Sequence, residues 1–296
     1  MLRPILFLSL LVIPVHHLSA QVTVEAAGLV PRLGEVRQLV SETIDQPLSG
    51  LDLAYGHADG PQMVDLTAEL TGAERLVMTQ SVLSPGSAPD HELYPAADYV
   101  LYIQGSSPDL EDTWYFVEDT PEGGRVLGTS GGNGTEDPLT DLIGGDSQSG
   151  FPTYEGLYPL TFGEAFGPLE IPLDMDLGDF RRSGAMTLQG AVDAWGTVVV
   201  PAGRFEALRM HQWGVAHFVF AGGGADTLRF TEELDGYTWI SPGVGQVAAV
   251  QEVRIDFPPE MGVPLSYLTQ VTRLQSYQPG PTAVALTTWG RIKAGF

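Results

Sequence analysis

Hydrophobic and polar residues alternate in short runs along most of the chain. In residues 253–257, Val-Arg-Ile-Asp-Phe, the apolar side chains take the odd positions and the charged ones the even positions. A repeat of two is typical of a strand with one buried face, because successive side chains point to opposite sides of a sheet. The same reasoning predicts strands at residues 63–70, 75–83, 98–104, 113–118, 185–194, 197–201, 205–220, 227–234, 247–257 and 265–277.

These strands predict an all-β fold. Turn-forming residues separate the runs, and the chain contains 36 glycines and 22 prolines. The pattern lacks helices long enough to connect parallel strands, so antiparallel pairing is expected. The prediction is an antiparallel sandwich or half-open barrel with Gly/Pro-rich loops and little helix.

Two segments also fit a helical spacing. Residues 33–44 space their apolar side chains roughly as a helix would, yet the Val and Thr residues in this stretch suit a strand, which we favour. Residues 287–296 place Trp289, Ile292 and Phe296 on one helical face and are the second helical candidate.

Composition divides the body of the chain. Residues 128–150 are rich in glycine and acidic residues and poor in apolar ones, which predicts a loop or linker between two β segments, 21–127 and 151–277. Four prolines between residues 152 and 172 favour an extended or looped start to the second segment. Residues 278–296 form a tail. Whether the two segments share one core stays open.

The first twenty residues resemble a secretory signal peptide. Arg3 supplies the positive charge, residues 5–15 are an apolar run, and Leu18-Ser19-Ala20 ends in a small residue at the cleavage position. The run is short for a membrane anchor, which needs about 20 residues. We therefore expect an exported protein that is periplasmic, on the cell surface or secreted, with no transmembrane segment in the mature chain.

Charge and cysteine content exclude several classes of protein. The chain has 14 basic and 37 acidic residues, for a net charge of −23, and no cysteine. Disulfides, thiolate metal sites and a cysteine nucleophile are therefore excluded. A nucleic-acid partner is not expected, because binding to phosphates requires a basic surface. Such an acidic surface suits a saline medium, where salt screens self-repulsion.

Four stretches resemble a skeleton found in exported β-rich proteins of Gram-negative environmental bacteria. Residues Pro31–Glu35 and Met63–Leu70 are similar to their P-x-x-G-D opening and W-D-F-S-x-L strand, and Tyr158–Phe166 to their F-P-L-x-Y-G-x-x-W/F element. Residues Gly196–Arg209 resemble a G-T-L-x-L-P-x-G-x-F-x-x-x-L-R hairpin. The resemblance implies a β fold and an exported location, and it brings no catalytic residues.

Two histidines in one predicted strand raise the question of a metal site. His211 and His217 are six residues apart and so lie on the same face, but six residues of strand span about 20 Å. One ion could join them, with Glu206 or Asp226 as a third ligand, only if the chain folded back at Gly214. Packing or a surface position is favoured for both rings.

Acidic clusters are the better metal candidates. Asp174, Asp176 and Asp179 alternate around a glycine, and calcium prefers several oxygen ligands in such an arrangement. A second cluster comprises Glu136, Asp137, Asp141 and Asp146 in the Gly-rich loop. We predict calcium at Asp174, Asp176 and Asp179; the alternative is that these are solvated loop acids.

Other catalytic patterns are weak. Ser147 lies in Gly-Asp-Ser-Gln-Ser-Gly, which departs from the nucleophile elbow G-x-S-x-G and precedes no predicted helix. A hydrolase with two carboxylates remains an alternative, although 37 acidic residues give no way to choose the pair. No catalytic residue is predicted.

Aromatic residues offer a binding surface. Trp114 and Phe116 should face one side of a strand and Tyr115 the other. Further aromatics are Tyr94, Tyr99, Tyr102, Trp195, Trp213, Tyr237 and Trp239. Gathered on one face, such rings would stack on sugars or apolar ligands; otherwise they fill the core.

The sequence as a whole predicts an exported, non-enzymatic β protein with a structural, adhesive or ligand-binding role. Its partner would be a glycan, an apolar ligand or a component of the cell surface. The alternatives are a secreted carbohydrate-active hydrolase and a carrier of an apolar ligand. The tail 289–296, Trp-Gly-Arg-Ile-Lys-Ala-Gly-Phe, contains the single lysine, Lys293, and is either a sorting tag or a frayed end.

Overall fold

The structure is a computed structural model that describes residues 23–24, 31–51, 55, 60–106, 112–120, 123–131, 159–172, 175–176, 180–222, 227–259, 262 and 264–281. Within these residues the only helices are three single 3-10 turns, η2 (Leu48–Gly50), η3 (Pro85–Ser87) and η4 (His91–Leu93). None of the described helices is long and apolar enough to cross a membrane. The predicted signal segment, Ser147 and the 282–296 part of the tail lie outside the described residues.

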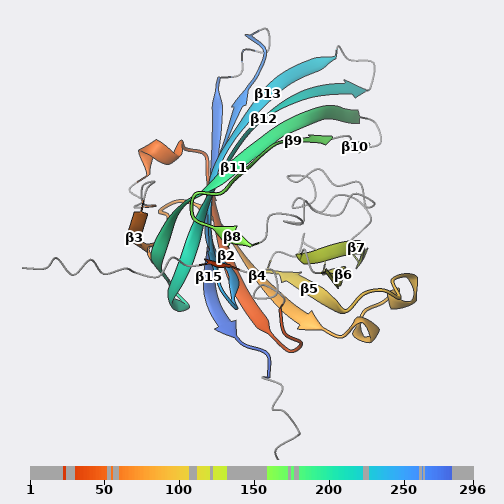
Figure 1. Cartoon of the computed structure of the whole chain (residues 1–296). Coiled ribbons are helices and arrows are strands. Elements are labelled where there is room, and N and C mark those ends of the chain that lie inside the picture. The colour runs from red at the N-terminus through yellow and green to blue at the C-terminus, as the bar shows by residue number, and fades with distance from the viewer. Residues whose placement is uncertain are drawn as a thin grey trace, which may run out of the picture.

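Strands make up most of the described chain (Figure 1). The first half contains β1 (Thr23–Val24), β2 (Val36–Ile44), β3 (Gly60–Asp65), β4 (Glu74–Leu83), β5 (Tyr99–Gly105), β6 (Thr113–Thr120) and β7 (Gly123–Gly131). The second half contains β8 (Leu160–Thr161), β9 (Ala165–Pro172), β10 (Met175–Asp176), β11 (Phe180–Val200), β12 (Gly203–Gly222), β13 (Leu228–Ser241), β14 (Gly245–Asp256) and β15 (Ser266–Gln278). The all-β prediction is confirmed.

One large sheet organises the molecule. Its strand order is β10-β11-β12-β13-β14-β15-β2-β4-β5-β6-β7, and the two end strands, β10 and β7, do not pair with each other in the described chain. The sheet bends so that β11–β13 and β4–β7 curve toward the side where β8 lies (Figure 1). The architecture is therefore a strongly bent, half-open sheet. Strand β15 pairs with β2, so the sheet runs unbroken through both predicted β segments.

One pairing departs from the antiparallel expectation. Strand β3 runs parallel to β11, with Gly196 opposite Gln62. No helical crossover is needed, because the connection between the two strands contains β4 to β10. Gly196 has a φ of +144°, and a Cβ there would lie 2.0 Å from the Gln62 carbonyl oxygen. Only glycine lets the two backbones approach this closely.

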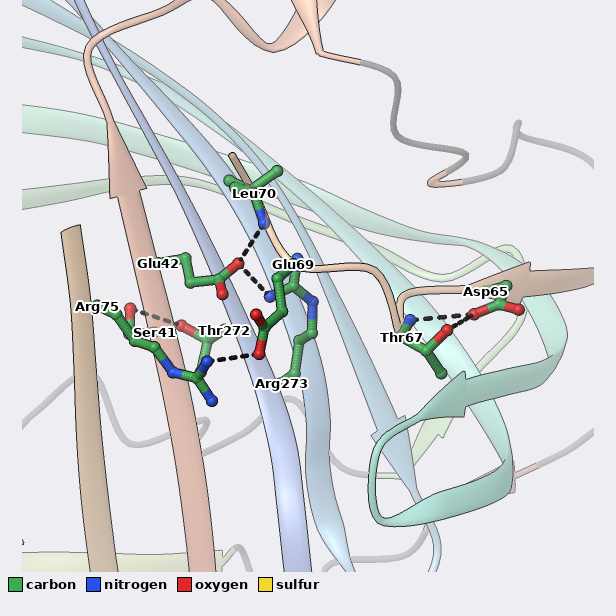
Figure 2. A network of polar contacts seen from close by, with 9 residues as sticks. All are labelled: Ser41, Glu42, Asp65, Thr67, Glu69, Leu70, Arg75, Thr272 and Arg273. Carbon is green, nitrogen blue, oxygen red and sulfur yellow. Dashed lines mark hydrogen bonds and ion pairs between the residues drawn. The ribbon is translucent and has the colours of Figure 1, made fainter. Parts of the chain in front are cut away.

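The strand predicted at residues 63–70 ends early, at Asp65. Asp65 Oδ1 accepts hydrogen bonds from the Thr67 backbone N at 3.0 Å and from its hydroxyl at 2.7 Å (Figure 2). A side chain that bonds its own backbone two residues on offers a turn in place of a strand ladder. These bonds also lower the pKa of Asp65. Leu66 still bonds Val199 through its backbone, and the chain then leaves the sheet edge.

The sheet has two differently covered faces. Residues 46–51, 55 and 60–70, which we call the strap, lie on the outer face, where Leu48, Val64 and Leu66 pack with buried residues of β11–β15 such as Trp239 and Val271. The strap contains β3, at the left in Figure 1. The opposite, inner face packs on β1 and β8, through the cluster Val24, Leu160, Val192, Leu208, Met210 and Ile240. One core cluster therefore draws on both predicted β segments.

Polar side chains from four strands fasten the strap through its backbone. Glu42 of β2 accepts from the Leu70 N at 2.8 Å, and the Thr269 hydroxyl of β15 donates to the Gln46 carbonyl at 2.6 Å. Glu252 of β14 accepts from the Leu48 N, and Arg209 of β12 donates to the Tyr55 carbonyl at 2.9 Å. These four backbone groups lie outside β3, and side chains of the sheet satisfy them in place of a strand ladder.

Figure 2 shows how the charge of Glu42 is balanced. Arg273 Nη1 donates to Glu42 Oε2 at 2.5 Å, and both side chains are at most 3% exposed. Beside this pair, on the outer edge of the strap, Arg75 donates to Glu69 at 2.5 Å in an exposed ion pair. The buried pair joins β2 to β15 at the point where the strap leaves the sheet.

Candidate functional site

The outer face of the sheet becomes polar and aromatic where the strap ends. Arg209, His211 and Trp213 alternate along β12 and so project from the same face as the buried Ala207. On β13, Tyr237 lies directly opposite His211, and Asp235 lies directly opposite Trp213. The two strands therefore carry a continuous strip of functional groups from the covered part of the sheet to its open part.

Four rings make successive contacts along this strip, and we call them the ring ladder. Tyr55 of the strap contacts Tyr237 with ring centroids 5.1 Å apart. Tyr237 stacks on His211 at 4.5 Å and an angle of 12°, and His211 contacts Trp213 at 4.7 Å. The ladder leads from the strap to Trp213, whose only ring contact among the described residues is with His211.

His211 is held by a carboxylate as well as by rings. Its Nε2 lies 2.6 Å from Asp235 Oδ1, and the side chains are 27% and 49% exposed. Because a carboxylate accepts, the imidazole Nε2 carries the proton and donates. This bond and the flanking rings fix the orientation of His211, so the surface around Trp213 is preorganised.

A β-bulge supplies the buried end of the site. The pairing of β11 with β12 shifts between Val192 and Ala194, which leaves Asp193 as the extra residue. Arg209 donates Nε and Nη2 to the two oxygens of Asp193 at 2.9 and 2.8 Å. The Arg209 guanidinium carbon also lies 4.8 Å from the Tyr237 ring centroid. The Arg209 guanidinium thus links Asp193 in the bulge to Tyr237 of the ring ladder.

The environment of Tyr237 keeps its phenol protonated. Burial raises the pKa of Tyr237 to about 12, and the negative charge of Asp235 contributes in the same direction. An ionised phenolate would be poorly solvated here and would lie close to a carboxylate. Tyr237 therefore acts as a neutral ring and hydrogen-bonding group rather than as a base.

The structure keeps His211 and His217 apart, as the interpretation without a shared metal ion requires. Strand β12 runs straight through Gly214 without folding back, so His211 and His217 lie on one face as predicted but pair with separate partners. His217 Nδ1 is 3.2 Å from the Thr231 hydroxyl, and Glu206 accepts a hydrogen bond from Thr197 at 2.7 Å. Within the described part of the chain, no three His, Asp or Glu side chains gather around one point.

The predicted calcium ligands fall mainly outside the described residues. Asp174 and Asp179 are not described, and Asp176 is described only as backbone of β10, where it pairs with Arg181. The second acidic cluster, between Glu136 and Asp146, also lies outside the described residues. So does Asp226, a candidate third ligand for an ion shared by His211 and His217. The calcium site stays a prediction.

Most of the predicted aromatic set fills the core. Phe116 and Trp114 share the outer face of β6 and pack under the 84–97 segment, whereas Tyr115 packs on the inner face, as the alternation predicts. Trp239 is buried in the main core. Trp195 contacts Phe162 at 4.5 Å. On the outer face, Tyr102 stacks on Trp114 at 4.0 Å, and Trp213 and Tyr237 each contact His211.

Part of the site could not be found from the sequence. Asp193 reaches Arg209 only because of the bulge, and the residues are sixteen apart in sequence. Tyr55 comes from a distant segment. A weak signal did exist for Arg209, because an arginine among the apolar residues 207–210 needs a buried partner.

Comparison with known proteins gives structural similarity but no match by sequence. No protein-family model and no curated protein matches the sequence. Among solved structures, it is similar to a protein from Bacteroides fragilis that is inferred to be exported and has a YmcC-like fold, at 13% identity and a TM-score of 0.27 over 84% of this chain and 97% of that one. A protein from Parabacteroides distasonis that is inferred to be a lipoprotein gives 14% identity and a TM-score of 0.32 over the same shares.

Proposed function

We propose that the chain is an exported, non-catalytic protein that binds a ligand on the outer face of its sheet, at the exposed end of the ring ladder. Export is supported by the charge, apolar run and small-residue end of residues 1–20. Ligand binding is supported by the site itself. The candidate ligand classes are a glycan, an apolar molecule or a component of the cell surface.

The observation that carries the proposal is the ladder from Tyr55 to Trp213. Aromatic rings of a β protein are normally buried in the core, as Trp239 is here. The ladder instead continues past the covered core to half-exposed His211 and Trp213, on the central strands β12 and β13. Rings held by neighbours on a rigid sheet lose little freedom on binding.

The pairing of the nearby acids supports a binding role over hydrolysis. A two-carboxylate hydrolase needs one acid that donates a proton to the leaving group. Both oxygens of Asp193 instead accept hydrogen bonds from Arg209, and one oxygen of Asp235 accepts from His211. Glu233 is likewise paired with Arg254 at 2.8 Å. Asp193, Asp235 and Glu233 accept hydrogen bonds from basic side chains and so hold those side chains in place.

The test is a parallel screen of binding and turnover with residues 21–296. Calorimetry against polysaccharides, fatty acids and whole-cell envelope fractions should show binding without release of reducing sugar. Trp213→Ala should weaken that binding while the melting temperature stays within a few degrees of the parent. Measured glycan cleavage that is lost on substitution of one acid would favour the hydrolase instead.

The carrier alternative makes a different prediction. A carrier of an apolar ligand should bring that ligand through purification, so organic extraction and mass spectrometry of the purified chain would find it in stoichiometric amount. Its retention should not depend on Trp213, which lies on the outer face. A stoichiometric lipid that survives Trp213→Ala would replace the proposal made above.

A further inference from the structure

A row of three side chains crosses the open end of the ring ladder. Gln189 of β11 and Asp235 of β13 lie directly opposite Trp213 of β12, one on each side. Directly opposed residues in antiparallel strands share a face, and two strand spacings make the row about 10 Å long. We infer that this row is a subsite for an uncharged saccharide, which stacks on the Trp213 ring. The inference rests on the proposed function.

The centre of the row provides an apolar platform. Trp213 is half-buried, with His211 against its inner side at 4.7 Å. The next residue outward on the same face is Val215, which is 38% exposed. The apolar C–H face of a pyranose ring packs on such a surface, because the aromatic face carries partial negative charge.

The ends of the row provide hydrogen bonds. Asp235 uses Oδ1 for His211, and its Oδ2 has no partner among the described residues. The Gln189 amide likewise has none there and can donate and accept. A planar carboxylate and a planar amide flanking a ring match the hydroxyl edges of a sugar. An apolar ligand would cover these groups without satisfying them, at a cost in free energy.

The charges around the row select a neutral ligand. Asp193 is matched by Arg209, Asp235 by the bond from His211, and Glu233 by Arg254, so the local acids already have partners. The protein as a whole carries −23, which repels an anionic polysaccharide. A cationic ligand would have to compete with the partners already in place.

The experiment uses residues 21–296 and four probe classes in calorimetry. The neutral probes are oligosaccharides that are first selected on a glycan array and then measured in solution. Polygalacturonate is the anionic probe, chitosan oligomers are the cationic probe, and a fatty acid is the apolar probe. Neutral saccharides should bind, and their affinity should change little between low and high salt. Trp213→Ala should weaken binding by about tenfold or more, whereas Trp213→Tyr should keep most of it.

Two further variants complete the design. Gln189→Ala should weaken binding with little effect on stability, because its amide has no hydrogen-bond partner among the described residues. Trp114→Ala removes a ring from the same face of the sheet on β6, outside the row, and should leave binding unchanged. Melting curves check that each variant folds.

The outcomes separate the two levels of the argument. Binding of the anionic, cationic or fatty-acid probe in place of neutral saccharides, lost in Trp213→Ala, would keep the proposed function and overturn the saccharide inference. Neutral-saccharide binding that is as tight in both Trp213→Ala and Gln189→Ala as in the parent would overturn the assigned row. The failure of every probe to bind would overturn both.

Discussion

Arg209 donates two hydrogen bonds to Asp193, at 2.9 and 2.8 Å, and a third to the Tyr55 carbonyl at 2.9 Å. One guanidinium that is 2% exposed therefore joins the bulge of β11, the middle of β12 and the strap. The fork of an arginine fits two carboxylate oxygens and still has a donor to spare, which a lysine could not match. The pair fixes the base of the ring ladder.

Removing Asp193 should destabilise the fold strongly. Asp193→Ala leaves Arg209 buried without its counter-charge, and breaking one side of a buried pair costs about 3–5 kcal/mol. Urea unfolding followed by tryptophan fluorescence measures the change. The matched control is Glu118→Ala, which breaks the exposed pair with Arg125 on β6 and β7 and should cost about 1 kcal/mol or less. If the two variants lost the same free energy of unfolding, the buried pair would contribute no more to stability than the exposed one.

The Glu42–Arg273 pair allows a double-mutant cycle. Glu42→Gln should destabilise the chain by a similar amount, because Arg273 stays buried and two of its donors, Nε and Nη2, already lack hydrogen-bond partners among the described residues. Adding Arg273→Met removes the stranded charge, so the double variant should recover much of the loss. If the two losses simply add, the pair is not coupled as described.

Gly196 should not tolerate a side chain. Gly196→Ala forces a Cβ into the Gln62 carbonyl and strains a φ of +144°, so β3 should detach from β11 at a cost above the 1–3 kcal/mol that is typical of backbone strain alone. Two controls separate the causes. Gly243→Ala has a φ of +73° but open space, and Gly86→Ala has open space and an ordinary φ. Hydrogen exchange at residues 60–65 should rise only for Gly196→Ala.

Tyrosine ionisation should make the protein unstable in alkali. Burial raises the pKa of Tyr99 to about 12, with the charge of Asp119 adding to the effect. The unfolded value is near 10, so between pH 10 and 12 the unfolded chain has lost a proton that the folded chain keeps. Stability is therefore full below about pH 10 and falls as the pH rises through 12. Tyr99→Phe should make this fall shallower while changing the dependence below pH 9 little.

Calcium should raise the melting temperature if the predicted ligands bind it. A site filled at a hundredfold excess over its Kd stabilises a fold by about 2.7 kcal/mol. Melts of residues 21–296 in EDTA, in calcium and in NaCl of matched ionic strength measure this. Asp174→Asn combined with Asp179→Asn should abolish the calcium effect and leave the NaCl effect. An equal shift in calcium and NaCl would mean that only screening acts.

Alternation predicted most of the sheet because one face of each strand is buried. Residues 253–257 lie in or just after β14 and 205–220 within β12, and residues 36–44 form a strand rather than a helix. Elements that break the local rules were missed. Asp235-Gly236 is a usual turn signal, but Gly236 lies in the middle of β13, paired with both Gln212 and Gln251. Pairing on two sides overrides the turn preference there.

The site was only partly predictable, because some of its contacts depend on how the strands pair. The spacing placed His211 on one face of a strand, and the aromatic count suggested a ring surface that included Trp213. The partner of His211 across the sheet, Tyr237, depends on the register of β12 and β13, which the sequence does not state. Asp193 depends on a bulge, and a bulge shifts the face of every residue after it. Long-range register is therefore the missing information.

The join between β15 and β2 also determines when the protein can finish folding. Ile44 pairs with Thr269, so β2 waits for a strand that is made far later in the chain, and such long-range contacts slow folding. Until then β2 presents an unpaired edge on which a second chain could add a strand. The net charge of −23 makes incomplete chains repel one another. The acidity would thus protect the nascent molecule during the interval before its sheet is complete.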